Sequence, residues 1–201
     1  MKTAFCFDLD GTLTRQEILP LIARDIDLYQ EFEALTLATI NGVIPFVNSF
    51  KLRCRILAEV PISRVRAIVA QVKFYEQIVE FVSQNKTCCF IATGNLDVWI
   101  DEIAQKIGCP VYSSTAKYTN DKLNGIAKIL DKAEAVDDIR TKGFDRVVTI
   151  GDGMGDVGMF QQADISIAYG ATHNPNQTLL ELSNFVTFNE TALCRTLSTL
   201  L

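Results

Sequence analysis

The sequence contains a single histidine, His173, among 201 residues, and none of its six cysteines stands in a C-x-x-C pair. This excludes the common zinc sites, which need clustered cysteine or histidine ligands. Most of the cysteines lie in apolar stretches such as FCF and TCCFIA, where a cysteine behaves as a small buried side chain. Cysteines in such apolar surroundings fit a reducing compartment best, so we expect a cytoplasmic protein.

Long apolar runs and excess positive charge are also missing. No segment reaches the ~18 uninterrupted apolar residues of a membrane span, and the N-terminus MKTAFCFDLDG lacks the pattern of a signal peptide. The net charge is −5, with no local run of lysine or arginine, so we expect neither a nucleic acid nor a membrane surface as partner. A hydrophobic content of 48% suits one domain, or one domain with a small insert.

Short apolar runs alternate with longer segments of helical spacing. Buried strands are predicted at Thr3–Phe7, Thr87–Ala92, Val147–Ile150 and Ile165–Ala168, with Asn184–Thr187 as a fifth candidate. Helices are predicted at Leu96–Ile107 and Asp131–Arg140. The polar stretch Tyr112–Leu123, with a turn at Asn120-Asp121, is a loop or a small β-hairpin. The alternation predicts an α/β fold whose parallel sheet is covered on both faces.

One region breaks this alternation. From roughly Leu19 to Lys73 the spacing is helical, no strand is indicated, and Gly42, Pro45 and Pro61 divide the region into short helices. Such a length is too great for a single crossover. We therefore predict a helical cap domain over residues 17–73, inserted into a core made of residues 1–16 and 74–201.

Acidic residues stand just after two of the predicted strands. Asp8 and Asp10 follow the first, and Asp152 and Asp156 follow Val147–Ile150. Because the carboxyl ends of parallel strands share one edge of the sheet, these side chains are expected to converge. Clustered carboxylates repel one another, and Mg²⁺ relieves that repulsion because it prefers oxygen ligands. Taken singly, an aspartate after a strand is commonly a turn former or a helix cap.

A candidate anion site follows the second strand. Thr93, with the backbone N–H groups of Gly94 and Asn95, stands where a helix is predicted to begin, and helix N-termini bind anions. Thr93 alone would be an ordinary helix cap. A metal site beside an anion site indicates phosphoryl chemistry. The G-x-G-x-x-G spacing of Gly153, Gly155 and Gly158 is discounted as a dinucleotide site, because the neighbouring carboxylates would repel a pyrophosphate.

Three segments resemble motifs of the haloacid dehalogenase superfamily. DLDGTLT resembles its first motif, IATGN its second and GDGMGD its fourth, in the right order between Phe7 and Phe160. The family's third motif is a lysine, and Lys132 in DKAEAV resembles the one in phosphoserine phosphatase-like members. Lys128 is the rival candidate, and Lys117 and Lys122 are more remote ones. The resemblance implies a Rossmann-like, doubly wound core and a phosphatase.

The resemblance also implies aspartyl-phosphate catalysis. Asp8 would attack phosphorus as the nucleophile, and Asp10 would protonate the leaving oxygen and then activate the hydrolytic water. Mg²⁺ would be bound by Asp8, the Asp10 backbone carbonyl, Asp152 and Asp156. The phosphoryl oxygens would be bound by Thr93 and Lys132.

The cap narrows the resemblance to phosphoserine phosphatases. Those enzymes carry a glutamate seven residues after the second aspartate, here Glu17, for the substrate amine. They carry a cap arginine for the substrate carboxylate, here Arg53 in RCRILAEVPI, and an aromatic residue seven positions earlier, here Phe46. Gly94 and Asn95 complete the implied substrate site. The alternative is that Glu17 and Arg53 are exposed to solvent on the cap and that Phe46 belongs to the hydrophobic core.

Two departures from that branch leave the substrate open. Thr93-Gly94-Asn95 stands where phosphoserine phosphatases usually read SGG, and Gly155 replaces an asparagine. The expected partner is a small phosphorylated metabolite: phosphoserine or a similar amino acid, or alternatively a sugar or nucleotide phosphate. A phospho-acceptor signalling module fits less well, because this chain is too long for one and contains a helical insert. Asp10 also argues against it, because a long-lived phospho-aspartate would not have an acid/base residue beside it. A binding protein with an inactive site fits least. Whether the protein is a monomer or a homodimer stays open.

Overall fold

A computed structural model of the chain describes residues 1–201. Its seven-stranded sheet has the order β4-β3-β2-β1-β5-β6-β7. The strands are β1 (Thr3–Phe7), β2 (Cys89–Leu96), β3 (Val111–Thr119), β4 (Lys122–Lys128), β5 (Arg146–Gly151), β6 (Ile165–Tyr169) and β7 (Phe185–Thr187). All neighbours pair in parallel except β3 and β4, which form an antiparallel hairpin at one edge. The predicted α/β class is confirmed.

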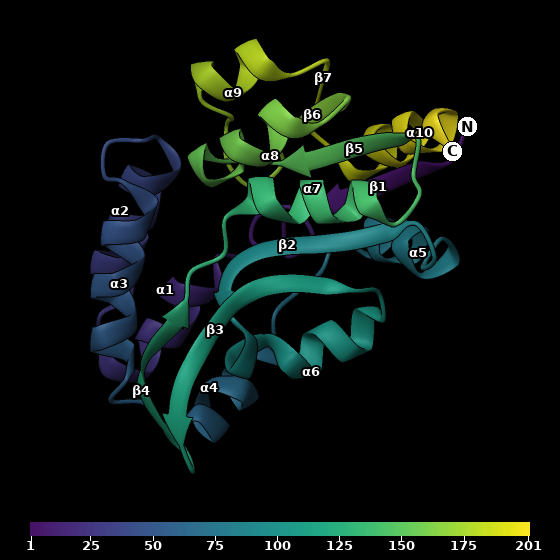
Figure 1. The fold of residues 1–201 in the computed structure, drawn as a ribbon. Coiled ribbons are helices and arrows are strands. Elements are labelled where there is room, and N and C mark those ends of the chain that lie inside the picture. The colour runs from purple at the N-terminus through teal and green to yellow at the C-terminus, as the bar shows by residue number, and fades with distance from the viewer.

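Helices cover both faces of this sheet (Figure 1). Those of the core are α5 (Glu76–Gln84), α6 (Asp97–Ile107), α7 (Lys132–Thr141), α8 (Val157–Gln162), α9 (Gln177–Leu182) and α10 (Glu190–Leu200). Residues of α5, α6 and α10 join the larger apolar cluster with Phe5 and Phe7, and residues of α7, α8 and α9 join the smaller one with Ala4 and Cys6. Successive side chains of β1 thus enter opposite layers, as the two-residue period of a strand requires.

Two elements differ from the sequence prediction by more than one residue at a boundary. The second strand begins two residues later than predicted and continues through Thr93, Gly94 and Asn95 to Leu96, with a register shift against β3 between Thr93 and Leu96. The polar stretch after α6 is the hairpin rather than the loop, and it extends to Lys128. Its turn places Asn120 at a φ of +53°, a conformation that asparagine tolerates better than most residues.

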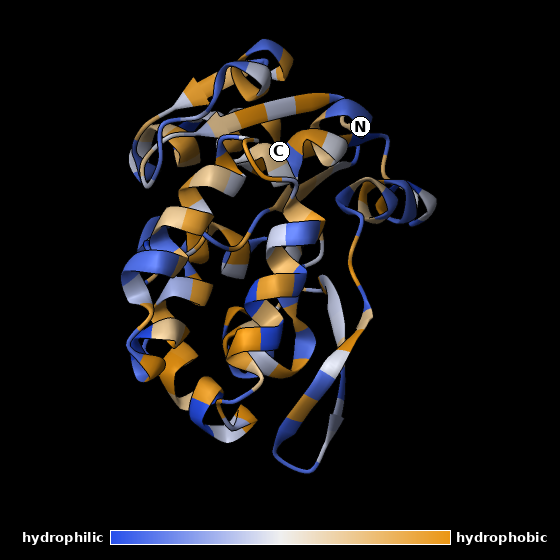
Figure 2. Ribbon diagram, turned by 90° about the vertical axis from the view of Figure 1, so that its left-hand side faces the viewer, coloured by the Kyte–Doolittle hydropathy of each residue, from blue (hydrophilic) through white to orange (hydrophobic).

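The insert after β1 is helical, as its spacing indicates. It contains α1 (Ile18–Ala23), the 3-10 helix η1 (Arg24–Ile26), α2 (Tyr29–Ile40), α3 (Phe46–Leu57) and α4 (Ile62–Val69). Figure 2, seen from the side of α2 and α3, shows hydrophilic and hydrophobic residues alternating along these ribbons. Phe32 and Phe50 are buried beneath them. An isolated bridge pairs Thr14 with Phe74, so the two segments that connect insert and core run side by side.

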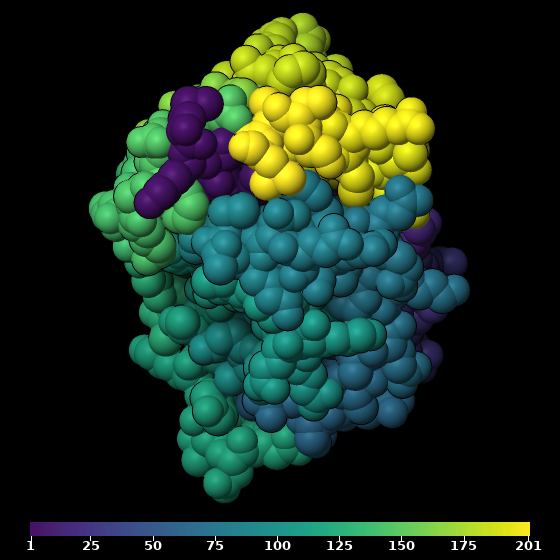
Figure 3. Space-filling view, turned by 90° about the vertical axis from the view of Figure 1, so that its right-hand side faces the viewer, coloured from purple at the N-terminus to yellow at the C-terminus, as the bar shows by residue number.

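The insert and the chain termini lie at opposite ends of the sheet. In Figure 1, α2 and α3 stand beyond the carboxyl ends of β1, β2 and β5, and both termini lie at the far end. Figure 3 shows the first residues against the C-terminal α10. None of the helices has the length and apolarity required to cross a bilayer. The edge of the sheet that carries the predicted aspartates is therefore the one that faces the helical insert.

Candidate active site

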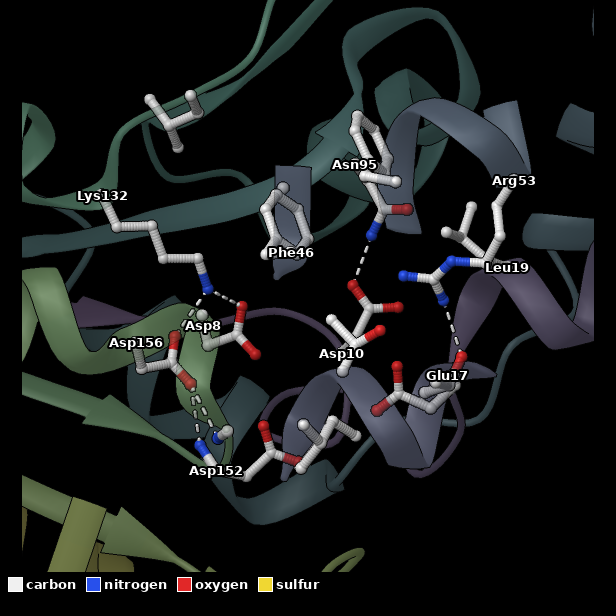
Figure 4. A pocket seen from close by; sticks show the side chains of 18 residues that line it. Asp8, Asp10, Glu17, Leu19, Phe46, Arg53, Asn95, Lys132, Asp152 and Asp156 are labelled. Atoms are coloured by element: carbon white, nitrogen blue, oxygen red, sulfur yellow. Dashed lines mark hydrogen bonds and ion pairs between the residues drawn. The ribbon is translucent and has the colours of Figure 1, made fainter. Parts of the chain in front are cut away.

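A cavity of about 110 Å³ lies between the insert and the carboxyl ends of the central strands. Its walls come from four parts of the chain: the segment after β1, the cap helices, the end of β2, and the loops around α7 and β5. Nearly all residues predicted for the site line it, namely Asp8, Asp10, Glu17, Phe46, Arg53, Gly94, Asn95, Lys132, Asp152 and Asp156 (Figure 4). Thr93 is the exception.

Lys132 joins two of the buried carboxylates. Its ammonium donates to Asp156 Oδ1 at 2.6 Å and also to Asp8. Burial disfavours the ammonium, but the charges of Asp156 and Asp8 raise the Lys132 pKa above its usual range. The Asp131 side chain caps α7, so Lys132 is its first residue and points into the cavity. Lys128, the rival candidate, pairs with Glu134 at the exposed surface.

Asp156 organises the loop after β5. Its Oδ2 accepts the backbone N–H groups of Asp152 and Gly153, each at 3.0 Å, while its Oδ1 receives Lys132. A side chain at Gly151 would overlap the Asp156 carboxyl group, so a glycine permits this close approach. Both oxygens of Asp156 are therefore held by the protein, and its charge is balanced by the lysine.

Asp152 is less well satisfied. It is only 3% exposed, and its Oδ2 has no hydrogen-bond partner. Burial, together with the charges of Glu17, Asp8 and Asp156, raises its pKa well above the ordinary value. Gly11, at a φ of +70°, leaves room for this carboxylate, which any side chain at that position would overlap.

This arrangement fits a hard cation. One carboxylate oxygen from each of Asp8, Asp152 and Asp156 lies within 4.8 Å of the others, and all three residues are buried. A bound Mg²⁺ would give the unpartnered oxygen of Asp152 a ligand and would offset the repulsion that burial intensifies. The residues present therefore suit magnesium.

Asp10 is held from two directions. Its Oδ1 accepts the backbone N–H of Ile18 at 2.8 Å, and its Oδ2 accepts from the side-chain amide of Asn95. Burial, reinforced by the charge of Glu17, raises the pKa of Asp10 to about 7. A carboxyl group with a pKa near neutrality can both give and take a proton at the pH of the cell.

The second strand corrects one prediction. Thr93, Gly94 and Asn95 do not stand at a helix N-terminus, because β2 continues to Leu96 and α6 begins only at Asp97. Thr93 is fully buried behind the cavity wall, and its hydroxyl oxygen accepts from the backbone and side-chain N–H groups of Asn95. A side chain at Gly94 would overlap the Phe46 ring, so this glycine lets the insert approach the strand.

A buried arginine side chain lies at the other end of the cavity. Arg53 is 3% exposed and donates to the hydroxyl of Thr36 at 2.7 Å and, at 3.4 Å, to the carbonyl of Ser49. It has no carboxylate within ion-pair distance, and burial lowers its pKa. Phe46 stacks on Phe50 beside it, with ring centroids 5.3 Å apart. A buried guanidinium with free donors beside an apolar wall suits an anionic group on a small ligand.

Glu17 has a partner that sequence reasoning missed. Its Oε1 lies 3.1 Å from Nε2 of His173, in the loop after β6. The two residues are 156 positions apart, and the lone histidine matches no motif. The available signal was its place in a polar loop after a buried strand, at the same sheet edge as the aspartates. Oxygens and nitrogen of Glu17, Asp152 and His173 also lie within 4.8 Å of one another.

Comparison with known proteins places the chain among hydrolases. The family model described as haloacid dehalogenase-like hydrolase matches residues 5–161. The phosphoserine phosphatase of Methanocaldococcus jannaschii is 26% identical over 185 residues, which cover 85% of this chain and 86% of that protein. The phosphoserine phosphatase of Archaeoglobus fulgidus is 28% identical over 182 residues, but this chain spans only 53% of its length.

Solved structures agree in fold. A substrate-bound phosphoserine phosphatase complex superposes with a TM-score of 0.85 at 22% identity, covering 97% of each chain. A phospho-aspartyl intermediate analogue of phosphoserine phosphatase superposes with a TM-score of 0.83 at 21% identity, covering 97% of this chain and 98% of that one. At these identities the likeness establishes the arrangement of core and insert, and the chemistry has to be argued from the residues in the cavity.

Proposed function

The chain belongs to the haloacid dehalogenase-like hydrolases, and on that basis we propose that it is a magnesium-dependent phosphomonoester hydrolase working through an aspartyl-phosphate on Asp8. The observation that carries the proposal is the convergence of Asp8, Asp10, Lys132 and Asp152 in one cavity. The relatives named phosphoserine phosphatase support the same activity class.

Each residue has a definite task in this mechanism. The carboxylate of Asp8 attacks phosphorus, and the bond from phosphorus to the leaving oxygen breaks. Asp10 gives its proton to that oxygen, then removes a proton from the water that hydrolyses the acyl phosphate. The Lys132 ammonium, already bonded to Asp8, offsets the negative charge of the transferred group.

Asp8, Asp152 and Asp156 are the side chains that would hold Mg²⁺. Bound there, the ion would polarise the phosphoryl oxygens as a Lewis acid. Thr93 has a different place from the one its motif implies, because its oxygen faces Asn95 and its side chain does not reach the cavity wall. We therefore assign it a supporting role rather than direct phosphate binding.

We propose phosphoserine or a similar small phosphorylated amino acid as the substrate. Arg53 offers free guanidinium donors to a carboxylate, and Glu17 offers a carboxylate to an ammonium. Phe46 and Phe50 form the apolar wall between them. The cavity size suits a metabolite rather than a macromolecule.

A second candidate is another small phosphomonoester. Two observations favour it: His173 already engages Glu17, and a side chain at Gly155 would meet nothing within 4 Å, so the cavity rim is open there. A pocket built closely around phosphoserine would leave the Glu17 carboxylate free for the substrate amine and would be closed beside Gly155.

Phosphate release is the direct test. Wild type is expected to release phosphate from p-nitrophenyl phosphate and phosphoserine with Mg²⁺ and not with EDTA. Asp8→Asn should lose at least about 1,000-fold in kcat while melting cooperatively, and the exposed Asp137→Asn should match wild type. Near-wild-type turnover by Asp8→Asn would overturn the mechanism.

The substrate class has its own test. Arg53→Ala should lower kcat/KM for phosphoserine by roughly 10- to 100-fold, the worth of a charged hydrogen bond, and leave p-nitrophenyl phosphate within about threefold. Unchanged phosphoserine activity would favour the second candidate. We also propose a cytoplasmic location, supported by six free cysteines, four of them buried.

A further inference from the structure

Asn95 contacts the proposed acid/base directly. It is 4% exposed, it lies in β2, and its side-chain amide donates to Asp10 Oδ2. Figure 4 shows the amide directed at that carboxylate from the side opposite Glu17. The sequence motif assigns Asn95 to substrate binding, but its amide N–H is already used by the protein.

Thr93 fixes the orientation of this amide. Its hydroxyl oxygen accepts from Asn95 Nδ2 at 3.2 Å and from the Asn95 backbone N–H at the same distance. The two hydrogens on Nδ2 therefore have two acceptors, the Thr93 hydroxyl oxygen and Oδ2 of Asp10. The chain Thr93–Asn95–Asp10 runs from the interior of the strand to the cavity.

The second hydrogen bond to Asp10 also comes from an amide N–H group. The backbone N–H of Ile18 donates to Oδ1, so each oxygen of Asp10 receives one hydrogen bond. An amide N–H can only donate. Neither partner can take up the carboxyl proton of Asp10, and that proton is left for a group in the cavity.

We propose that Asn95 is a positioning residue for Asp10, holding the carboxyl group so that its proton is directed at the leaving oxygen of the phosphomonoester. The inference rests on the proposed function, since it needs Asp10 to act as a general acid. It does not depend on which phosphomonoester is the substrate.

The test varies the leaving group. Phenyl phosphate and p-nitrophenyl phosphate have the same ring, but the nitrophenol is the more acidic alcohol and leaves with little help from an acid. The ratio kcat/KM includes only the steps up to release of the alcohol, so it isolates the first proton transfer. Neither compound carries the amine or carboxylate that a substrate-binding role for Asn95 would recognise.

Asn95→Ala and Asn95→Gly are expected to lower kcat/KM for phenyl phosphate at least about tenfold, a fraction of the 10²- to 10⁴-fold typical of general acid catalysis. For p-nitrophenyl phosphate the loss should stay within about threefold. Asn124→Ala, at an exposed asparagine that also makes one side-chain hydrogen bond, should leave both substrates unchanged. Thermal melts of each variant show whether it is folded.

Equal losses on the two substrates in both folded variants would overturn the inference, because a purely structural or substrate-binding role has no dependence on leaving-group acidity. No loss on either substrate would overturn it as well. Failure of the proposed function looks different: wild type would then hydrolyse none of the phosphomonoesters.

Discussion

Replacing Asp152 by asparagine is expected to stabilise the metal-free protein while abolishing its response to Mg²⁺. Asp152 is 3% exposed, one of its oxygens has no partner, and its nearest charges are carboxylates. Without a cation, this side chain opposes folding. Asparagine has nearly the same shape, carries no charge and can donate to the neighbouring carboxylates.

The magnitudes follow from burial and mass action. Relieving one buried, unsatisfied polar group is worth about 1–3 kcal/mol, which for a chain of this size is a rise in Tm of roughly 2–12 °C. In wild type, Mg²⁺ at 100 times its Kd adds about 2.7 kcal/mol, a rise of roughly 5–11 °C. Asp152→Asn should show almost none of this Mg²⁺-induced rise in Tm.

Thermal unfolding in EDTA and in a Mg²⁺ titration measures both quantities. Asp137→Asn, at an exposed position on α7, is the matched control and should behave as wild type in each. If Asp152→Asn melts below wild type in EDTA, or retains the Mg²⁺ shift, the assignment of Asp152 as an uncompensated metal ligand is wrong.

The pH dependence gives an independent check. Burial raises the pKa of Asp152 above its ordinary 3.8 and that of Asp10 to about 7. A carboxyl group whose pKa is raised on folding contributes stability that is complete below its ordinary pKa and is lost as the pH rises through its folded value. In EDTA, Asp10 should therefore cost wild type stability as the pH rises from 3.8 to about 7. Asp152 should add a further cost above pH 3.8, and that cost should be absent in Asp152→Asn.

Three further substitutions probe the same cavity. Gly11→Ala should lower the Tm and weaken Mg²⁺ binding in melts, because its positive φ costs a side chain about 1–2 kcal/mol and a Cβ would overlap Asp152; an unchanged Mg²⁺ titration would contradict this. Lys132→Met should lose about 3–5 kcal/mol of unfolding free energy in denaturant titrations without metal, as removal of one partner from a buried ion pair does; a loss below 1 kcal/mol would show that the carboxylates do not need the lysine. His173→Ala should lower KM for phosphoserine roughly three- to tenfold, because it frees the Glu17 carboxylate for the substrate amine, while His173→Gln and the kinetics of p-nitrophenyl phosphate stay near wild type.

The strands and the acidic cluster could be predicted because their signals are local. Thr3–Phe7 is a continuous apolar run that ends at Asp8, and the structure has the same bounds for β1. The helical insert could be predicted from spacing and from its proline and glycine breaks. Lys132 could be favoured over Lys128 only by resemblance, since the deciding feature is the Asp131 cap that starts α7 at Lys132.

The rest depends on contacts between distant segments. The end of β2 differs from the prediction because Thr93-Gly94-Asn95 extends the strand through a register shift against β3, which no periodicity within the segment reveals. Asn95 reaches Asp10 across 85 positions, and His173 reaches Glu17 across 156. Such pairs exist only once the parallel strands have aligned their carboxyl ends.

In the proposed mechanism, Asp10 connects the reaction to the cap. One of its oxygens is bonded to Ile18, the first residue of the insert's first helix, directly after Glu17. The other is bonded to Asn95 on β2, next to Gly94, against which Phe46 of the insert packs. A shift of the insert would move the Ile18 N–H and the Phe46 ring together and would disturb Asp10 from both sides. Under the proposed mechanism, substrate selection by the insert and proton transfer by Asp10 are coupled through the same few atoms, so substrates that fill the cap poorly should lose kcat as well as gain KM.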